Sequence, residues 1–181
     1  RLTMSFKRLT PVTDKLVETL NEKAGAFETL ESLFEQQLDV LRNGETDALG
    51  PLAMKAQDCT DTIEDLRQTY RRQARLLVRM LELEADAPSL ETLIEGLEQR
   101  APSAEASTRL AEARAAVLER AESAQRTNDT LQFALEYAAG LNHELLAAVQ
   151  QAAVDTDRRT YTADGTAESG GGEHSLVNTV G

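Results

Sequence analysis

Few residues in this chain have the types and spacing that catalysis or metal binding requires. The two histidines, His143 and His174, lie far apart in sequence and match no metal-ligand spacing. Cys59 is the single cysteine, and no histidine flanks it as a base, so we interpret it as a small buried apolar side chain. Most carboxylates fall on outward positions, which is typical of a solvated surface. We therefore predict that the protein is not an enzyme and needs no metal and no cofactor.

Charge and hydropathy limit the classes of partner. The 181-residue chain has a formal net charge of −12 at pH 7, which disfavours nucleic acid and anionic membrane surfaces, since both attract basic proteins. No window approaches the ~20 apolar residues of a membrane span. The first residues, "RLTMSFKRLTPV", lack the apolar stretch of a signal peptide. Together with a single cysteine, these features predict a cytoplasmic protein without membrane insertion.

Apolar residues recur in steps of three and four along most of the chain, which is the spacing of an amphipathic helix. The first such stretch begins at Pro11, where Thr13 or Asp14 is suited to cap a helix, and "RNG" at residues 42–44 is a stop signal. Pro51 falls in the first turn of the second stretch, where a missing N–H does no harm. The predicted helices span Pro11 to Arg42, Leu49 to Met80, Ser89 to Arg100, and Ser103 to about Val154.

One apolar stripe on each long segment, with short turns between segments, favours helices packed side by side. We predict an all-α fold, an elongated antiparallel bundle of three long helices plus one short helix. The helical domain is assigned to residues 1–154. Residues 155–181 are assigned to a disordered C-terminal tail, because "TYTADGTAESGGGEHSLVNTVG" is rich in glycine and polar residues. The tail also contains Tyr161, a large aromatic side chain that a passive linker does not require.

The second predicted helix contains a run of arginines that allows two interpretations. No acidic residue occurs between Leu66 and Leu81. The run is either an outward face that pairs with acidic neighbouring helices, or a patch for an acidic segment of a partner. Its members are Arg67, Arg71, Arg72, Arg75 and Arg79.

The last predicted helix also contains residues that a simple bundle does not explain. Asn128 and Asn142 lie two heptads apart on the apolar stripe, where they either fix the register of the bundle or bond to a docked helix. Phe133 and Tyr137 lie off the stripe. Both are large apolar groups that a lone hairpin leaves partly exposed, which suggests a partner, whereas a three-helix bundle accommodates them as core.

With these segments placed, the chain resembles the FlgN family of flagellar export chaperones. The matching segments are "LRNGETDAL" followed by "MKAQDCTDTIEDL", then "QRTNDTLQFALEYAAGLNHELLAAV" with its two asparagines, and "TYTADGTAES" running to "SLVNT". Their order, together with "YTADG" at that place, is more specific than any helical part alone. The chain departs from the family pattern at Pro88 to Pro102 and at the glycines 170–172.

The resemblance implies a cytoplasmic chaperone without ATPase activity. Members of the family bind the C-terminal helices of the hook–filament junction proteins FlgK and FlgL, keep them unpolymerised, and deliver them to the export gate protein FlhA. By the same resemblance, Tyr161 is expected to contact the export gate; the alternative is that its ring packs against the helix ends and caps the bundle. A structural coiled-coil adaptor without an export role is the alternative. The expected client-binding residues, on the last long helix, are Asn128, Leu131, Leu135, Tyr137, Ala138, Asn142 and Leu145.

Overall fold

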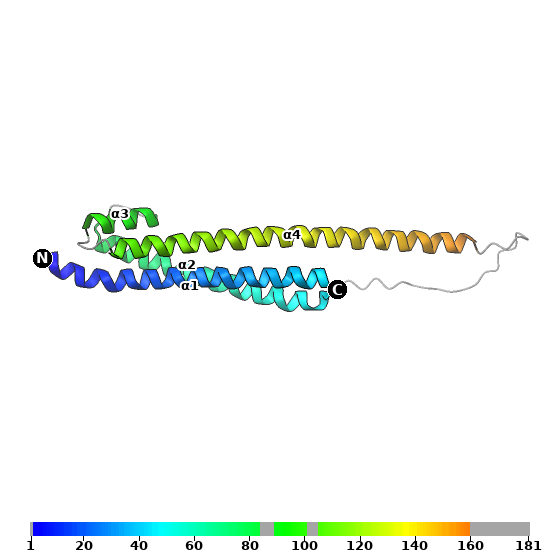
Figure 1. Cartoon of the computed structure of the whole chain (residues 1–181), viewed down its shortest axis with the longest axis horizontal. Coiled ribbons are helices and arrows are strands. Elements are labelled where there is room, and N and C mark those ends of the chain that lie inside the picture. Colours follow the sequence, from blue (N-terminus) through cyan, green and yellow to red (C-terminus); the bar gives the residue numbers. More distant parts are fainter. Residues whose placement is uncertain (1, 84–88, 101–104, 160–181) are drawn as a thin grey trace, which may run out of the picture. The chain divides into compact units, whose positions relative to one another are not determined.

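The computed structural model describes the backbone of residues 2–83, 89–100 and 105–159 and the side chains of residues 9–83, 89–99 and 105–152 (Figure 1). Within these ranges the chain is all-α, with three long helices and one short helix, as the sequence predicts. The predicted tail from residue 160 onward lies outside the described residues. The elements are α1 (Leu2–Asn43), the 3-10 helix η1 (Thr46–Ala48), α2 (Leu49–Met80), α3 (Leu90–Arg100) and α4 (Glu105–Arg159).

The chain divides into two compact units, and α4 contributes to both. The first unit comprises Arg1–Leu135 and contains α1, η1, α2, α3 and the first half of α4. The second comprises Glu136–Gly181, and its described part is the second half of α4. α4 extends to Arg159, five residues past the predicted end near Val154.

A tight turn joins α1 to α2. Gly44 has a φ of +73°, a left-handed conformation that glycine adopts without a steric penalty. The backbone N–H of Glu45 then donates to the carbonyl of Val40 at 3.0 Å, which satisfies one of the last carbonyls of α1. Both the predicted stop at residues 42–44 and the place of Pro51 in the first turn of α2 are confirmed.

The predicted start of the first helix is wrong. α1 begins at Leu2, and Pro11 lies inside it. Thr13 does not cap the helix, because its hydroxyl donates to the carbonyl of Leu9 at 3.1 Å. Asp14 does not cap it either, since its carboxylate accepts a 2.7 Å hydrogen bond from Arg109 of α4. Proline removes one helical hydrogen bond, and we attribute the continuity of α1 to core packing on both sides of it.

The core of the first unit is a line of aliphatic side chains from all four α-helices. The side chains with less than 2% exposure are all leucines, and predicted stripe positions such as Leu16, Leu77 and Leu110 are among them. The main cluster consists of Leu9, Leu16, Val17, Leu20, Ala74, Leu77, Val78, Leu81, Leu93, Leu97, Leu110, Ala113 and Val117. A smaller cluster of Leu30, Leu33 and Ala56 lies between α1 and α2.

Polar contacts fix the direction of α4 within the first unit. Arg109 pairs with Asp14 of α1, Arg120 with Glu28 at 3.6 Å, and the hydroxyl of Ser123 donates to Glu31 at 2.6 Å. The residue numbers rise together on the two helices, so this part of α4 runs parallel to α1. Because α1 and α2 form a hairpin, α4 is antiparallel to α2.

The short helix α3 starts where the sequence predicts. The side chain of Ser89 accepts a hydrogen bond from the backbone N–H of Thr92 at 3.1 Å, the arrangement of an N-cap. Leu93 and Leu97 of α3 are buried in the main cluster, and Glu91 pairs with Arg114 of α4. α3 therefore covers the part of the bundle that contains Leu81 and Leu110.

Candidate partner-binding surface

The described residues offer little for covalent or metal chemistry. No group of three or more His, Cys, Asp or Glu side chains in this part of the chain is arranged to hold a metal ion. Cys59 is half-buried between α1 and α2, and its thiol donates to the carbonyl of Ala26 at 3.2 Å. Burial raises the pKa of the Cys59 thiol, which keeps it in the less nucleophilic protonated form. His143 is exposed on α4.

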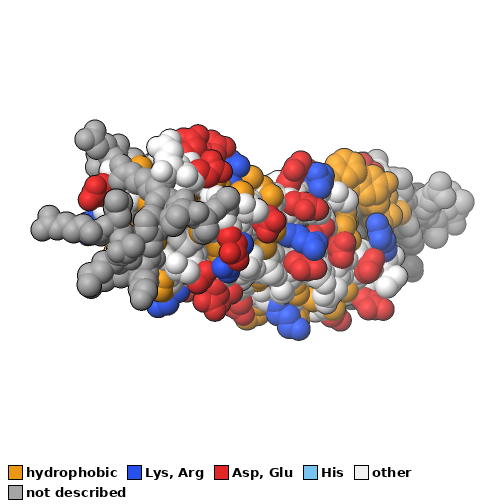
Figure 2. Space-filling view, turned by 60° about the vertical axis from the view of Figure 1, so that its left-hand side comes forward, with side chains coloured by type: hydrophobic (Ala, Val, Ile, Leu, Met, Phe, Trp, Pro, Cys, Tyr) orange, Lys and Arg blue, Asp and Glu red, His pale blue; other side chains and the backbone are white. Residues whose placement is uncertain are grey.

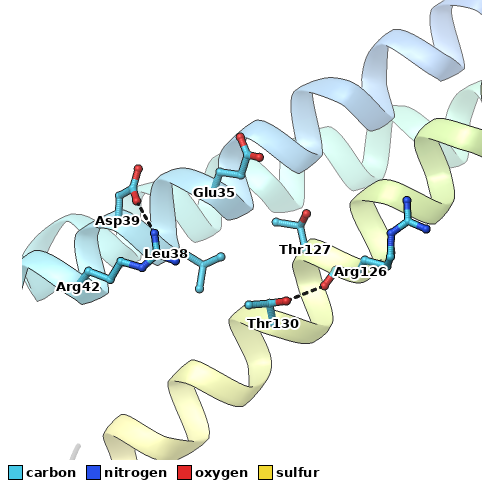
Figure 3. Close-up of a pocket in the computed structure, with 7 residues that line it drawn as sticks. All are labelled: Glu35, Leu38, Asp39, Arg42, Arg126, Thr127 and Thr130. Atoms are coloured by element: carbon cyan, nitrogen blue, oxygen red, sulfur yellow. Dashed lines mark hydrogen bonds and ion pairs between the residues drawn. The ribbon is translucent and has the colours of Figure 1, made fainter.

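A groove of about 440 Å³ lies between the last turns of α1 and the middle of α4 (Figure 3). Leu38 of α1 and Thr127 of α4 face one another across it. Most of its polar groups are engaged within their own helices, since Arg42 pairs with Asp39 at 3.2 Å and the hydroxyl of Thr130 donates to the carbonyl of Arg126. The groove therefore presents no converging set of free polar groups for a small ligand.

The structure separates the seven predicted client-binding residues into two groups. Leu131 is 4% exposed and belongs to the bundle, and Asn128 and Ala138 are partly buried. The other four, Leu135, Tyr137, Asn142 and Leu145, are exposed, Leu145 to 63%. Tyr161 lies outside the described residues. The sequence therefore placed one core residue, Leu131, among the expected client contacts.

The end of α1 explains why the exposure changes near residue 135. The contacts of Glu28 with Arg120 and of Glu31 with Ser123 both join residues 92 apart in sequence. With the same offset, the last residue of α1, Asn43, corresponds to Leu135. Beyond it every described side chain from Ala139 to Ala152 is exposed.

The exposed half of α4 has one apolar face. Each residue turns the helix by about 100°, so positions 138, 141, 145 and 149 fall within roughly 80° of one another. Leu135 and Leu146 border this group on one side and Tyr137 on the other. Between residues 136 and 152 the only formal charges are Glu136 and Glu144. Glu136 lies on the opposite side of the helix, and Glu144 lies at the border of the group, beside Tyr137. We call this surface, which consists of Leu135, Tyr137, Ala138, Leu141, Asn142, Leu145, Leu146 and Val149, the α4 apolar face.

Sequence reasoning did not assign Leu141, Leu146 and Val149 to the site, although all three are exposed. Val149 occurs in the apolar stripe, and the signal for Leu141 was its spacing of four residues from both Tyr137 and Leu145. Phe133 is 72% exposed and lies four residues before Tyr137, so it neighbours the same border of the apolar face. Figure 2 shows one side of the molecule, on which acidic and basic side chains are interspersed and hydrophobic side chains are exposed between them.

No helix in the described part of the chain is both long enough and apolar enough to cross a membrane. In the comparisons with known proteins, the family model described as "FlgN protein" matches residues 4–169, nearly the whole chain. No curated protein and no solved structure matches the chain significantly.

Proposed function

The chain belongs to the FlgN family of flagellar export chaperones, and from this membership we propose that it binds the C-terminal helices of hook–filament junction proteins similar to FlgK and FlgL. Binding keeps these clients unpolymerised in the cytoplasm until they reach the export gate protein FlhA. The observation that supports the proposal is the α4 apolar face. Apart from the partly buried Ala138, its side chains are exposed along several turns of a helix, where an amphipathic client helix can pack.

The chemistry of this face suits a helical client. Tyr137, Leu141 and Leu145 follow one another at intervals of four residues, which is the spacing of ridges that interlock between packed helices. Ala138 leaves room for a close approach. Asn142 supplies an amide on an otherwise apolar surface, and it is suited to bond a polar group of the client and so fix the register. The face has no cationic side chain, so recognition rests on apolar burial.

The proposed mechanism needs no nucleotide. The α4 apolar face covers the same kind of apolar helix surface that drives assembly of the client after export. The free energy comes from removing both surfaces from water, at about 25 cal/mol per Å². Ordering the client segment costs conformational entropy and offsets part of this gain, so the complex is reversible. Release at the export gate requires reversibility.

Complex formation with a purified client tests the proposal. We expect the protein to co-elute in size-exclusion chromatography with a fragment that contains the C-terminal helices of a FlgK-like protein. The control is a fragment of the same client without those helices, which should elute separately. If neither fragment binds, the export role of this chain fails and a structural coiled-coil adaptor becomes the better account.

A second expectation concerns Tyr161, two residues beyond the end of α4 at Arg159. We propose that its ring contacts the export gate, since tyrosine presents a large apolar surface with little rotamer entropy to lose. Tyr161→Ala should weaken binding of the client-loaded chaperone to the cytoplasmic domain of FlhA by about 2 kcal/mol, whereas Tyr161→Phe retains most of the contact. Calorimetric titration measures both affinities. Equal affinity of wild type and Tyr161→Ala would remove the gate role, while unchanged client binding separates it from a folding defect.

A further inference from the structure

The arginines of α2 form a continuous basic surface, which we call the α2 basic face. Arg67, Arg71, Arg75 and Arg79 follow one another at intervals of four residues, and Arg72 lies beside them. All five are exposed, and no acidic residue occurs between Leu66 and Leu81. Steps of four residues advance about 6 Å along a helix and turn by roughly 40°, so the four cations form a slowly winding row about 18 Å long.

The arginines of this face differ from the other described arginines in their partners. Outside the face, every arginine whose side chain the structure describes pairs with a carboxylate: Arg42, Arg109, Arg114, Arg120 and Arg126. Within the face, Arg67 pairs with Glu64 of the same helix at 2.7 Å, and Arg72 donates to the hydroxyl of Thr69 at 3.2 Å. Among the described residues, Arg71, Arg75 and Arg79 have no ion pair. These arginines therefore do not pair with acidic residues of neighbouring helices, which was one of the two interpretations of the run.

The neighbouring helix adds to the positive charge at one end of the face. Lys23 of α1 has its pKa held below the ordinary value, first by burial and then by the positive charge of Arg67, to which Arg71 also contributes. Glu64 opposes this effect. Like charges four residues apart destabilise a helix by a few tenths of a kcal/mol per pair. The chain therefore maintains a repulsive cluster that its own residues leave largely uncompensated.

We propose that the α2 basic face docks an acidic helical segment of a partner protein, whose carboxylates lie one helical turn apart. A glutamate at every fourth position of a helix repeats at about 6 Å, the same spacing as the arginine row. Arginine pairs with carboxylates through two parallel hydrogen bonds, which favours this partner over a merely diffuse anion. The face lies on α2 and is distinct from the α4 apolar face, so the inference does not depend on the client proposal.

The charge of the rest of the chain favours a short acidic segment over nucleic acid or a membrane. The whole chain carries −12, so without these five arginines the remainder carries −17. A vesicle surface or a long nucleic acid extends beyond a row of about 18 Å and meets this acidic remainder within a Debye length of about 8 Å at physiological salt. A single helix can lie on the face alone.

A labelled peptide tests the inference. The probe is a fluorescein-labelled helical peptide of repeating Glu-Ala-Ala-Gln, and its control has glutamine in place of every glutamate. Fluorescence anisotropy should show binding of the acidic peptide to the wild-type protein, weaker at higher salt because the contacts are exposed ion pairs. The control peptide should not bind.

Matched variants then locate the binding. Arg71→Gln, Arg75→Gln and Arg79→Gln together should weaken the acidic peptide about tenfold or more, from three lost contacts of up to about 1 kcal/mol each. Arg42→Gln, Arg120→Gln and Arg126→Gln together change the net charge equally, at exposed arginines outside the face, and should retain binding. Equal affinity of wild type and the first variant overturns the inference, and so does equal weakening by both variants. Oligo(dT) and phosphatidylserine vesicles are tested in the same way. If the wild type binds one of them but not the acidic peptide, and the first variant loses that binding, the inference is also overturned.

Discussion

Replacing Leu141, Leu145 and Val149 together by glutamine is expected to weaken binding of a FlgK-like C-terminal fragment by roughly 100-fold or more. The three side chains lie at intervals of four residues and form the centre of the α4 apolar face. Each of the three apolar side chains leaves water when the client binds, which contributes favourable free energy. Glutamine has a similar helix propensity but does not contribute this free energy. Because all three are exposed in the free protein, its thermal unfolding should change little. Isothermal titration calorimetry and circular dichroism measure the two quantities.

Met54→Gln is the control for this prediction. Met54 is 72% exposed, as much as any residue of the face, but it lies on α2, so its replacement should leave client affinity nearly unchanged. Unaltered client binding in the triple variant would show that the α4 apolar face is not the client surface. A loss of similar size in Met54→Gln would show that hydrophobicity in general, and not this face, governs binding.

Leu77→Ala is expected to reduce the free energy of unfolding by about 2–5 kcal/mol, because it leaves a cavity in the main core cluster. Leu77 has an exposure of 0% and lies among leucines of α1, α3 and α4. For a small helical protein such a change is a large part of the total stability. Urea unfolding followed by circular dichroism measures it.

The adjacent residue provides the comparison. Leu76 is 48% exposed, and Leu76→Ala should change the free energy of unfolding by no more than about 0.5 kcal/mol. Both variants replace leucine by alanine in α2, so the difference between their free energies of unfolding reports the burial of the replaced side chain. Similar losses in both variants would mean that residues 76 and 77 are packed differently from this structure.

Periodicity predicted much of the fold because it reports which side of a helix avoids water. Leu16, Leu77 and Leu110 were expected on the stripes of three different helices, and they meet in one cluster. The end of α1 was predictable because Gly44 adopts a positive φ, a conformation that glycine favours whatever its tertiary contacts. The start of α1 was missed because proline is a local signal, and packing of Leu9 and Leu16 outweighs it.

The division between core and exposed surface was harder to predict. Leu131 and Leu145 are separated by two heptads and occupy similar stripe positions, yet one is buried and the other exposed. The difference depends on where α1 ends relative to α4, which is a matter of register between segments about 92 residues apart. No local pattern contains that information. The pairing of arginines was equally inaccessible, since it depends on which helix lies within reach of each side chain.

The parallel arrangement of α1 and α4 has a consequence for the order of folding. The α1–α2 hairpin closes through a short turn, whereas α4 reaches α1 only through contacts 92 to 95 residues apart in sequence. Loop-closure entropy rises with the logarithm of that separation, so the hairpin forms first and α4 docks on it afterwards. α4 also leaves the ribosome after α1, α2 and α3. During that interval its whole apolar stripe is open to water, both the part that the hairpin later buries and the part that we assign to a client.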